Sequence, residues 1–491
     1  MSLVVVSNRV AKPKPNEPMT GGLAAALLPV VENSGAIWVG SSGRVRDATH
    51  KGPFAEIESL GEGALAMIDL PAAHYGGYYE GFANSALWPA LHSRSDLISS
   101  SQSDYQSYRE INAFMARALL RFRKPDTSYW IHDYHFLTLA RELRALGVDQ
   151  PIGFFLHTPW PSARIFVGVP HHRELVEAML SYDVIGFQTD HDCAHFTDYL
   201  QTELGLRVDD GIVSTARPGL YAGRARRTRL QVFPIGISVE GFAAQAARAA
   251  SHPEVARLRM SLEGKQLAIG VDRVDYSKGL VNRIGAFDRL LTMYPSLSRK
   301  VSMLQIATPS RETIEAYSQL QAELTRLVTT VNGRHGEVDW TPIRFISKGY
   351  SQQVLSGFYR VAAVGVVTPL HDGMNLVAKE YVAAQNPADP GVLVLSKFAG
   401  AASELDAALL VNPHDIDGMA QAIATALAMP LDERRERWDA MMAKLREHTV
   451  QRWFSDFVAA LDEGPSDDLL RPTSERPPLT LARTLRTIGQ H

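Results

Sequence analysis

Short apolar runs recur along the whole chain and alternate with longer stretches of helical periodicity. Most of these runs are apolar throughout and rich in β-branched residues, which is typical of parallel strands covered by helices on both faces. In the first half the runs are Leu3–Val6, Ala36–Gly40, Tyr129–His132, Ile152–Leu156 and Val184–Gln188. In the second half they are Leu267–Val271, Val301–Ala307, Ile343–Ser347, Val364–Thr368, Val392–Ser396 and Ala408–Val411. This number of strands is larger than one ordinary doubly wound sheet contains. The pattern therefore predicts an α/β chain of two doubly wound, parallel-sheet domains.

The predicted boundary between these domains lies at the run Val232–Ile237, which contains a Pro and a Gly and precedes an Ala-rich helix. We therefore expect domains over residues 1–235 and 236–462, and the last helix of the second can pack back on the first. Residues 205–229 are rich in Gly and Arg and predict a loop or hairpin at the surface. Residues 463–491 hold four prolines and no aromatic residue, which predicts a poorly packed tail.

The composition is that of an ordinary globular protein, with 45% apolar and 21% charged residues among 491. The net charge is −3, whereas a nucleic-acid binder typically carries an excess of basic residues. The single cysteine, Cys193, excludes an intrachain disulfide and a cysteine-rich metal site, and it fits a reducing cytoplasm. The first apolar run is too short for a secretory signal, and no run approaches the roughly 20 residues that span a membrane. We expect a cytoplasmic protein without membrane or nucleic-acid partners.

The segment from His371 to Glu380 carries the clearest chemical pattern. An apolar strand ends there in a polar turn with a glycine, and a helix-forming run begins at once. Such a helix start directs unpaired backbone N–H groups and a positive dipole end toward a ligand, for which phosphate is the natural partner. Asp372 and Glu380 lie eight positions apart, about two helical turns, so one carboxylate can stand at the mouth and the other deeper. The pattern predicts a site for a sugar nucleotide.

Cationic side chains follow two neighbouring strands of the second half. Arg273 and Lys278 flank a tight turn closed by Gly279, and Arg311 follows the next strand. Each cation alone is more simply a salt-bridged surface residue. Three of them at strand ends, together with Asp372, instead favour a clamp for a diphosphate or another phosphate.

The first half offers aromatic and polar groups at strand ends. The stretch from Tyr78 to Pro89 is dense in Tyr and Trp, which suits either a sugar site or an aromatic core. The sequence from His132 to His135 reads His-Asp-Tyr-His, which allows a metal site, a general acid or base at Asp133, or a sugar-hydroxyl ligand. His157 ends another strand, as a capping residue or as a donor to a sugar or phosphate.

Other patterns in the first half have simpler interpretations. Asp190 and Asp192 form an Asp-x-Asp, but Asp190 stands where a helix N-cap is expected, so we discount a metal site there. Arg9 follows the first strand and could contact an anion. The pair Gly21-Gly22 at a predicted helix start allows close approach of a ligand or simply forms a turn.

Taken together, the motifs of this chain resemble those of the retaining trehalose-6-phosphate synthases, glycosyltransferases of the two-Rossmann (GT-B) kind. The resemblance extends from about residue 3 to residue 461 and includes, in order, SNR, GGL, YYxxFxNxxLWP, WIHDYH, GFFLH, DRVDYSKGL, ATPSR, DWTP and TPLHDGMNLVAKEYVAAQ. It implies two Rossmann-like domains that face each other across a cleft. It further implies transfer of glucose from UDP-glucose to glucose 6-phosphate, giving α,α-trehalose 6-phosphate and UDP, without a metal or other cofactor.

The resemblance also assigns site residues, one position at a time. Those implied for the acceptor are Arg9, Tyr79, Trp88, Asp133 and Arg311. Those implied for the donor are Gly21, Gly22, His157, Arg273, Lys278, Tyr350, Asp372, Leu376, Val377, Ala378, Lys379 and Glu380. Within these sets, Arg273 and Lys278 would hold the diphosphate, Glu380 the ribose, Tyr350 the uracil region, and His157 with Asp372 the transferred glucose. Asp133, Arg273 and Lys278 would be the catalytic residues.

Two other functions stay open at this point. One is a related synthase with another acceptor, such as glycerol 3-phosphate, or another donor, such as ADP- or GDP-glucose. The other is a non-catalytic sensor of sugar phosphates. Self-association into a homo-oligomer is also left open, and a separate trehalose-phosphate phosphatase is the expected partner in the pathway.

Overall fold

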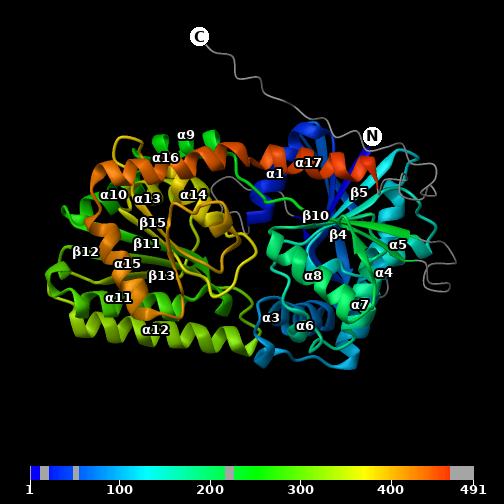
Figure 1. Cartoon of the computed structure of the whole chain (residues 1–491), viewed down its shortest axis with the longest axis horizontal. Coiled ribbons are helices and arrows are strands. Elements are labelled where there is room, and N and C mark those ends of the chain that lie inside the picture. Colours follow the sequence, from blue (N-terminus) through cyan, green and yellow to red (C-terminus); the bar gives the residue numbers. More distant parts are fainter. Residues whose placement is uncertain (1, 11–21, 48–54, 216–225, 465–491) are drawn as a thin grey trace, which may run out of the picture.

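The structure is a computed structural model that describes residues 2–10, 22–47, 55–215 and 226–464. Two α/β halves lie side by side along the long axis of the molecule (Figure 1). Each half is built on its own sheet, so the predicted two-domain α/β fold is confirmed. The expected boundary between residues 235 and 236 falls in the connection that leads from the last strand of the first sheet to the second half. None of the described helices is long and apolar enough to cross a membrane.

The first half carries a ten-stranded sheet in the order β3-β4-β2-β1-β5-β6-β7-β10-β9-β8. Its strands are β1 (Ser2–Arg9), β2 (Ile37–Arg46), β3 (Ala55–Leu60), β4 (Gly63–Pro71), β5 (Thr127–His132), β6 (Ile152–Phe155), β7 (Val184–Phe187), β8 (Val208–Asp209), β9 (Ile212–Thr215) and β10 (Arg226–Val232). The central pairs from β4 through β10 are parallel, whereas β3, β9 and β8 join at the two edges as antiparallel strands. The predicted parallel sheet is therefore present, and antiparallel strands extend it at both edges.

The strands that the apolar pattern missed lie mostly at these edges. β3 alternates partly buried with exposed positions, because one face of an edge strand meets solvent. An alternating strand of this kind contains no continuous apolar run. The surface hairpin expected between residues 205 and 229 corresponds to β8 and β9, with β10 continuing into the sheet.

The second half carries a six-stranded, wholly parallel sheet in the order β13-β12-β11-β14-β15-β16. Its strands are β11 (Gln266–Arg273), β12 (Val301–Thr308), β13 (Ile343–Ile346), β14 (Val364–Val367), β15 (Val392–Ser396) and β16 (Leu409–Val411). The chain proceeds from β11 in one direction and from β14 in the other, so the strand order reverses between them. In open α/β sheets ligands bind beyond the carboxyl ends of the strands at such a point.

Helices cover both faces of each sheet. The α-helices are α1 (Gly22–Ser34), α2 (Ala72–Gly76), α3 (Trp88–Leu91), α4 (Gln102–Leu119), α5 (Leu139–Ala145), α6 (Ala163–Phe166), α7 (His172–Met179), α8 (Asp190–Thr202), α9 (Val239–Ala249), α10 (Pro253–Leu262), α11 (Leu280–Met293), α12 (Glu315–His335), α13 (Gln352–Val361), α14 (Leu376–Ala384), α15 (Ile416–Ala428), α16 (Leu431–Glu447) and α17 (Val450–Glu463). The other helices are the π-helix η1 (Gly77–Leu87) and the 3₁₀ turns η2 (Ser95–Leu97), η3 (Leu120–Phe122), η4 (Tyr134–Phe136), η5 (Tyr276–Lys278), η6 (Pro295–Leu297) and η7 (Gly400–Ser403). Alternate residues of β11 illustrate the arrangement, because Leu267 and Ile269 pack into one core and Ala268 into another.

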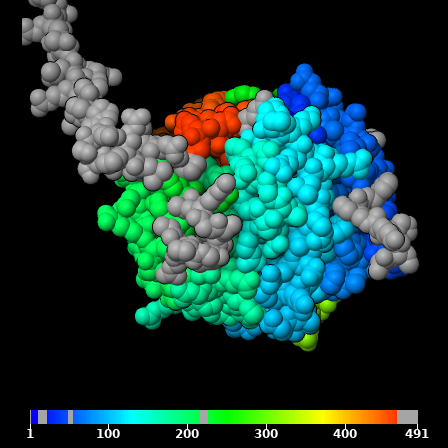
Figure 2. All heavy atoms as spheres, turned by 90° about the vertical axis from the view of Figure 1, so that its right-hand side faces the viewer, coloured from blue at the N-terminus to red at the C-terminus, as the bar shows by residue number. Residues whose placement is uncertain are grey.

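The last helix belongs to the first half in space. α16 lies along the second half, and α17 continues across onto the first (Figure 1). There Trp453 and Phe457 pack on Trp130 of β5, with ring centroids 4.7 and 4.6 Å apart. In the space-filling view the orange-red C-terminal segment accordingly lies beside the cyan surface of the first half (Figure 2).

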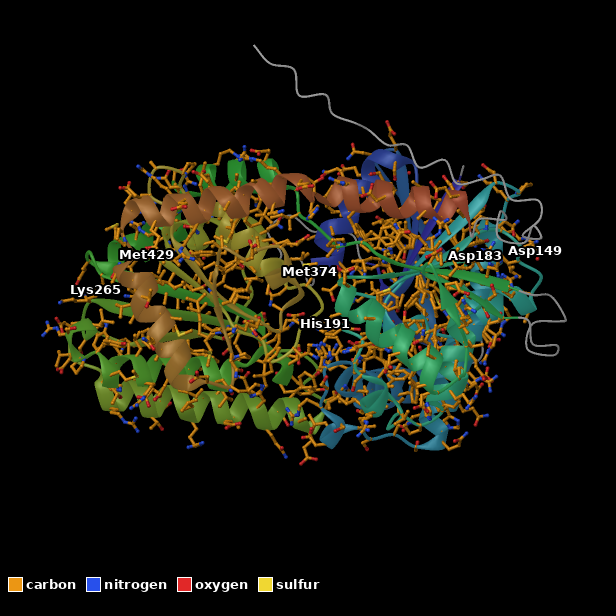
Figure 3. All side chains as sticks on the ribbon, in the orientation of Figure 1. Asp149, Asp183, His191, Lys265, Met374 and Met429 are labelled. Atoms are coloured by element: carbon orange, nitrogen blue, oxygen red, sulfur yellow. The ribbon has the colours of Figure 1, made fainter. Side chains whose placement is uncertain are left out.

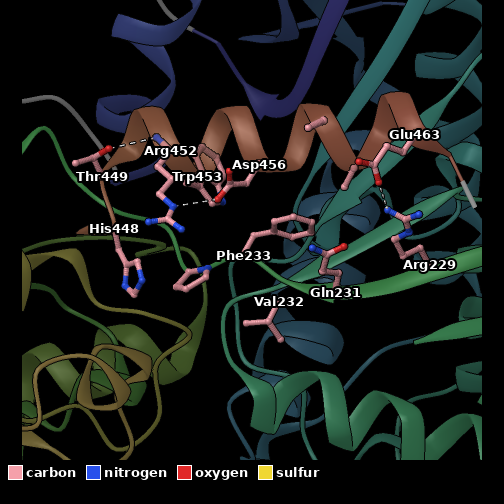
Figure 4. Close-up of a pocket in the computed structure, with 13 residues that line it drawn as sticks. Arg229, Gln231, Val232, Phe233, His448, Thr449, Arg452, Trp453, Asp456 and Glu463 are labelled. Carbon is pink, nitrogen blue, oxygen red and sulfur yellow. Dashed lines mark hydrogen bonds and ion pairs between the residues drawn. The ribbon is translucent and has the colours of Figure 1, made fainter. Parts of the chain in front are cut away.

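An ion pair ties the far end of α17 to the first sheet. Arg229 Nη1 of β10 lies 3.0 Å from Glu463 Oε2, and Arg452 pairs with Asp456 along the helix (Figure 4). The chain thus crosses between the halves twice. The two crossings run side by side, because Val450 N–H donates to Ile237 O at 3.3 Å.

Candidate active site

The loop after β11 places its cations by a tight, specific fold. Asp275 accepts a hydrogen bond from the backbone N–H of Ser277 at 3.0 Å, which caps the 3₁₀ turn η5. Gly279 follows with φ of +63°, and a Cβ there would lie 2.3 Å from Thr368 O. Only glycine fits this close approach between β11 and β14. The turn therefore fixes Lys278 at the edge where the strand order reverses.

Lys278 and Asp372 form an ion pair at this edge. Lys278 Nζ lies 2.5 Å from Asp372 Oδ2, and Asn375 Nδ2 donates to the same oxygen at 2.9 Å. Burial by itself would raise the pKa of Asp372, but Lys278 and the Asn375 hydrogen bond hold it below its usual value. Asp372 is consequently a carboxylate at neutral pH.

A buried arginine supports the loop from beneath. Arg283 is fully buried, and its Nη1 lies 2.5 Å from Asp272 Oδ2 and 3.2 Å from Gln305 Oε1. Its Nη2 donates to the backbone carbonyl of Lys278 at 3.2 Å. The sequence pattern missed Arg283, because an arginine inside a helix is usually a surface residue. Its guanidinium instead donates hydrogen bonds to buried acceptors beneath the loop and so holds the backbone of Lys278 in place.

The helix after β14 begins as the sequence predicted. Asn375 has a left-handed backbone with φ of 73°, no side chain caps the helix, and α14 starts at Leu376. Leu376 and Val377 are partly exposed at this start, whereas Ala378 is buried. One further turn on, burial raises the pKa of Glu380 to about 7, although a hydrogen bond from Gln352 opposes the shift. A ligand with hydroxyl donors can stabilise the ionised form of this carboxylate through further hydrogen bonds.

Lys379 has a different role from the neighbouring residues of its motif. Its side chain is fully buried, forms an ion pair with Glu404, and donates to Ile235 O at 2.8 Å. Glu404 Oε1 also lies 2.8 Å from His448 Nδ1. The ammonium thus links α14 to both crossings between the halves, and only the backbone of Lys379 is left for a ligand.

Asp133 lies at the carboxyl end of β5 in a strained conformation. Its φ of 75° and ψ of 166° belong to a region used almost only by glycine, at a cost of about 1–3 kcal/mol. Burial raises the pKa of Asp133 to about 6, against hydrogen bonds from the backbone of Tyr134 and His157 and the charges of Arg311 and Arg273. Strain and a raised pKa at a strand end are together typical of a functional carboxylate.

Arg311 lies between the two halves in an aromatic setting. Its guanidinium lies 4.0 Å from the ring centroid of Trp88, from the first half. It also donates to Tyr134 at 3.1 Å and to Tyr317 at 2.6 Å, and it pairs with Asp275 at 3.3 Å. Arg311 holds the pKa of the fully buried Asp275 below its usual value, against the effect of burial. Trp88 and Arg311, both predicted acceptor residues, are therefore in contact.

The remaining predicted acceptor residues line the same side. The aromatic stretch forms the π-helix η1 and then α3. π-helices are rare in proteins, and those that occur are often at functional sites. From η1, the ring of Tyr79 stacks on Tyr75 and on His135 at 5.6 and 6.0 Å. Arg9 is exposed at the end of β1, and its guanidinium lies over Gly43, where a Cβ would be only 2.9 Å away.

Contacts between the halves bring the donor motif against the first sheet. A Cβ on Gly373 would lie 2.0 Å from His157 O, and a Cβ on Gly22 would lie 3.0 Å from Leu376 Cδ1. Met374, from the same motif, lies at the junction of the two halves (Figure 3). Gly21 falls outside the described residues. The structure therefore gathers predicted residues from both halves at one junction.

Two further predicted donor residues, Tyr350 and Arg273, have different surroundings. Tyr350 packs edge-on against Phe358 at 5.1 Å, with Lys348 over its ring at 5.0 Å. Arg273 is exposed, 5.8 Å from the ring of Trp88. Its guanidinium is thus available to an anionic ligand.

The Asp-x-Asp sequence has a structural role. Thr189, not Asp190, caps α8, because its side chain accepts from the N–H of Asp192. Asp192 Oδ1 in turn accepts from the backbone N–H of Trp160 at 2.8 Å. Among the described residues, no group of three or more His, Cys, Asp or Glu side chains could hold a metal ion.

Comparison with known proteins identifies the family of the chain. The sequence profile of Glycosyltransferase family 20 matches residues 4–463. The chain belongs to glycosyltransferase family 20. A trehalose-6-phosphate synthase of Sinorhizobium fredii is 45% identical over 458 residues, which cover 93% of this chain and 97% of that relative.

Solved structures of similar sequence share the family 20 fold. An α,α-trehalose-phosphate synthase (UDP-forming) from Burkholderia xenovorans in complex with glucose-6-phosphate has a TM-score of 0.88 and 44% identity. The match covers 94% of this chain and all of that one. A trehalose-6-phosphate enzyme of E. coli bound with UDP-2-fluoro glucose has a TM-score of 0.85 and 39% identity, covering 94% and 99%.

Sequence reasoning missed several residues that contact the predicted site residues. Asp275, Tyr134 and Tyr317 surround Arg311, and Arg283 supports Lys278. Asp275 lies between Arg273 and Lys278 in the sequence, in a segment that was interpreted only through its two cations. A buried acid between two strand-end cations could have been suspected as their counter-charge, whereas the two tyrosines gave no signal before the halves were brought together.

Proposed function

We propose that the chain is a retaining glucosyltransferase that moves glucose from UDP-glucose to glucose 6-phosphate, giving α,α-trehalose 6-phosphate and UDP. Membership of family 20 and the names of the similar enzymes support the two substrates. The observation that carries the proposal is the contact of Arg311 and Trp88 across the junction. In this contact a guanidinium of one half lies beside the aromatic segment of the other, close to Asp133 and Arg273, which supports its proposed role in binding phosphate.

The second half is proposed to bind the donor. Arg273 and Lys278 hold the diphosphate, the start of α14 from Leu376 to Ala378 offers backbone N–H groups, and Glu380 accepts hydrogen bonds from the ribose. Asp372 accepts from hydroxyls of the glucose. The raised pKa of Glu380 supports its role, because hydroxyl donors of a ligand stabilise the charged form of that carboxylate.

The first half is proposed to bind the acceptor. Arg9 and Arg311 contact the phosphate of glucose 6-phosphate, and Tyr79 and Trp88 line the pocket. Asp133 holds hydroxyls of the acceptor at the reacting centre. Its strained backbone supports this role, since such strain persists where the surrounding structure fixes a group for function.

The reaction is proposed to proceed on one face of the donor sugar. The bond from the anomeric carbon to the diphosphate oxygen breaks, the anomeric hydroxyl oxygen of the acceptor bonds to the same face, and its proton passes to the departing phosphate oxygen. Negative charge grows on the diphosphate as the sugar becomes oxocarbenium-like, so the fixed cations Arg273 and Lys278 stabilise the transition state. Contact between the halves excludes water and disfavours hydrolysis.

An assay of UDP release over a panel of substrates tests the proposal. We expect turnover with UDP-glucose and glucose 6-phosphate, and a disaccharide phosphate whose two anomeric protons both show the α configuration by NMR. Turnover only with glycerol 3-phosphate, or only with ADP- or GDP-glucose, would identify a related synthase instead. Binding of UDP-glucose with no turnover of any pair would identify a sensor. The α,α-trehalose 6-phosphate made by the proposed synthase would be the substrate of a separate phosphatase, and cytoplasmic location is part of the same proposal.

A further inference from the structure

His132 and His157 form a hydrogen-bonded pair at the ends of two neighbouring strands. His132 Nδ1 lies 3.0 Å from His157 Nε2. His132 ends β5 and pairs in register with Phe155 of β6, so that His157, two residues later, reaches back over it. His132 belongs to none of the predicted donor or acceptor groups, yet it contacts a residue that does.

Aromatic side chains enclose the inner member of the pair. His132 is fully buried, with Trp130, Phe155 and Trp453 at ring-centroid distances of 4.5, 6.3 and 6.1 Å. Its other nitrogen, Nε2, is buried and has no hydrogen-bond partner. Burial lowers the pKa of both imidazoles, that of His157 to about 3, so both rings are neutral at physiological pH. One N–H therefore lies between two neutral rings.

Two arrangements of that proton exist, and they differ at the buried nitrogen. If His157 were the donor, His132 would carry its own N–H on Nε2, buried without an acceptor. If His132 is the donor, Nε2 is a bare acceptor and His157 carries its proton on Nδ1. Orphaned buried N–H groups are the rarer defect in proteins, which favours the second arrangement.

We propose that His132 is a positioning residue that holds His157 in the tautomer with its proton on Nδ1. The Nδ1–H is the polar group that the partly exposed His157 ring has left for a ligand, and it donates to an oxygen of the transferred sugar. This step rests on the proposed function. His132 also sets the orientation of the ring, since the hydrogen bond and the packing of Trp453 from α17 fix His157 from behind.

The protonation state can be measured in the ligand-free protein, which separates this proposal from the proposed function. We expect long-range ¹H–¹⁵N spectra of protein labelled with [¹⁵N]histidine to show His157 with a protonated Nδ1 and an unprotonated Nε2. His157→Asn serves to assign its signals. A protonated Nε2 on His157 would overturn the proposal, whether or not the protein turns over UDP-glucose.

Two substitutions of His132 test its effect on the reaction. Asn places an amide N–H near the position of Nδ1, whereas Leu fills the space without a donor. We expect His132→Leu to lower kcat/KM for UDP-glucose roughly tenfold, the value of one lost hydrogen bond, and His132→Asn to restore most of it. The affinity for UDP, which lacks the transferred glucose, should be unchanged in both variants.

The alternative outcomes are distinct. Equal losses in His132→Asn and His132→Leu, or equal weakening of UDP binding, would reduce His132 to a packing residue and overturn the proposal. His335→Leu is the matched control, because His335 pairs with Asp288 far from the junction and should leave kcat/KM unchanged. Thermal unfolding of each variant checks that the fold is retained.

Discussion

Lys278 Nζ lies 2.5 Å from Asp372 Oδ2, although 94 positions separate the two residues in the sequence. The pair joins the loop after β11 to the turn before α14, the two strand ends between which the order of the sheet reverses. Lys278 is proposed to act on the diphosphate and Asp372 on the glucose. The ion pair therefore couples the residue proposed for the leaving group to the residue proposed for the transferred group.

Lys278→Ala should lower kcat by roughly 10²–10³-fold with a smaller effect on KM, because the charge that Lys278 meets grows in the transition state. Steady-state kinetics with both substrates measures this. Arg289→Ala, which removes an exposed cation paired with Asp417, is the control. A raised KM with kcat unchanged would assign Lys278 to ground-state binding alone.

Gly373→Ala should impair the contact between the halves. Its new Cβ would lie 2.0 Å from His157 O, a backbone atom that cannot move aside cheaply. We expect a loss of roughly 10²-fold or more in kcat/KM, with UDP binding affected far less, as measured by kinetics and calorimetry. Gly333→Ala in α12 meets no atom within 4 Å and should instead stabilise the protein slightly. Wild-type activity in Gly373→Ala would show that this contact is not needed for turnover.

Arg311→Ala should raise KM for glucose 6-phosphate and also destabilise the fold. It leaves the carboxylate of Asp275 buried without its partner, which typically costs about 3–5 kcal/mol. Adding Asp275→Asn should restore much of the stability and none of the activity, as denaturant unfolding and kinetics of both variants will show. If the double variant is no more stable than Arg311→Ala, the two residues are not coupled.

Lys379→Met should act on stability and not directly on the nucleotide. The substitution leaves Glu404 buried beside His448, without the ammonium that also binds Ile235 O. We expect a lower Tm, and recovery of Tm when Glu404→Gln is added. UDP affinity measured by calorimetry should fall only where Tm falls, and it should recover when Tm recovers. A large loss of UDP affinity at unchanged Tm would instead indicate a direct contact from Lys379.

Glu380→Gln should make the ligand-free protein more stable at pH 8. The folded pKa of Glu380 is raised from 4.5 to about 7, so the folded protein binds a proton that the unfolded chain has released, and stability falls as the pH rises through this window. The variant should be more stable by up to about 3 kcal/mol above pH 7, with no difference below pH 4.5. Its UDP affinity should nevertheless fall roughly tenfold, since a neutral amide accepts ribose hydroxyls more weakly. Equal stability across the pH range would disprove the raised pKa.

The sequence by itself determined the fold class, the parallel core strands and the carboxyl ends of strands where polar and charged residues gather. Strands buried on both faces must be apolar throughout, so their positions are recorded in local composition, and the polar residue that follows each run marks a carboxyl end. Arg273, Lys278, Asp372 and Glu380 were predicted as site residues from such strand ends and the segments that follow them. The edge strand β3 was not, because its alternation reflects a half-exposed position that only the sheet order explains.

Only the tertiary structure decided which of these groups meet. Asp275, Tyr134 and Tyr317 surround Arg311 because two separate sheets approach each other, and no local pattern encodes that approach. Lys379 stands beside Glu380 in the sequence, yet its side chain turns inward to the crossings between the halves. Neighbouring helical positions point in different directions, so whether a motif residue faces ligand or core depends on what packs against the helix.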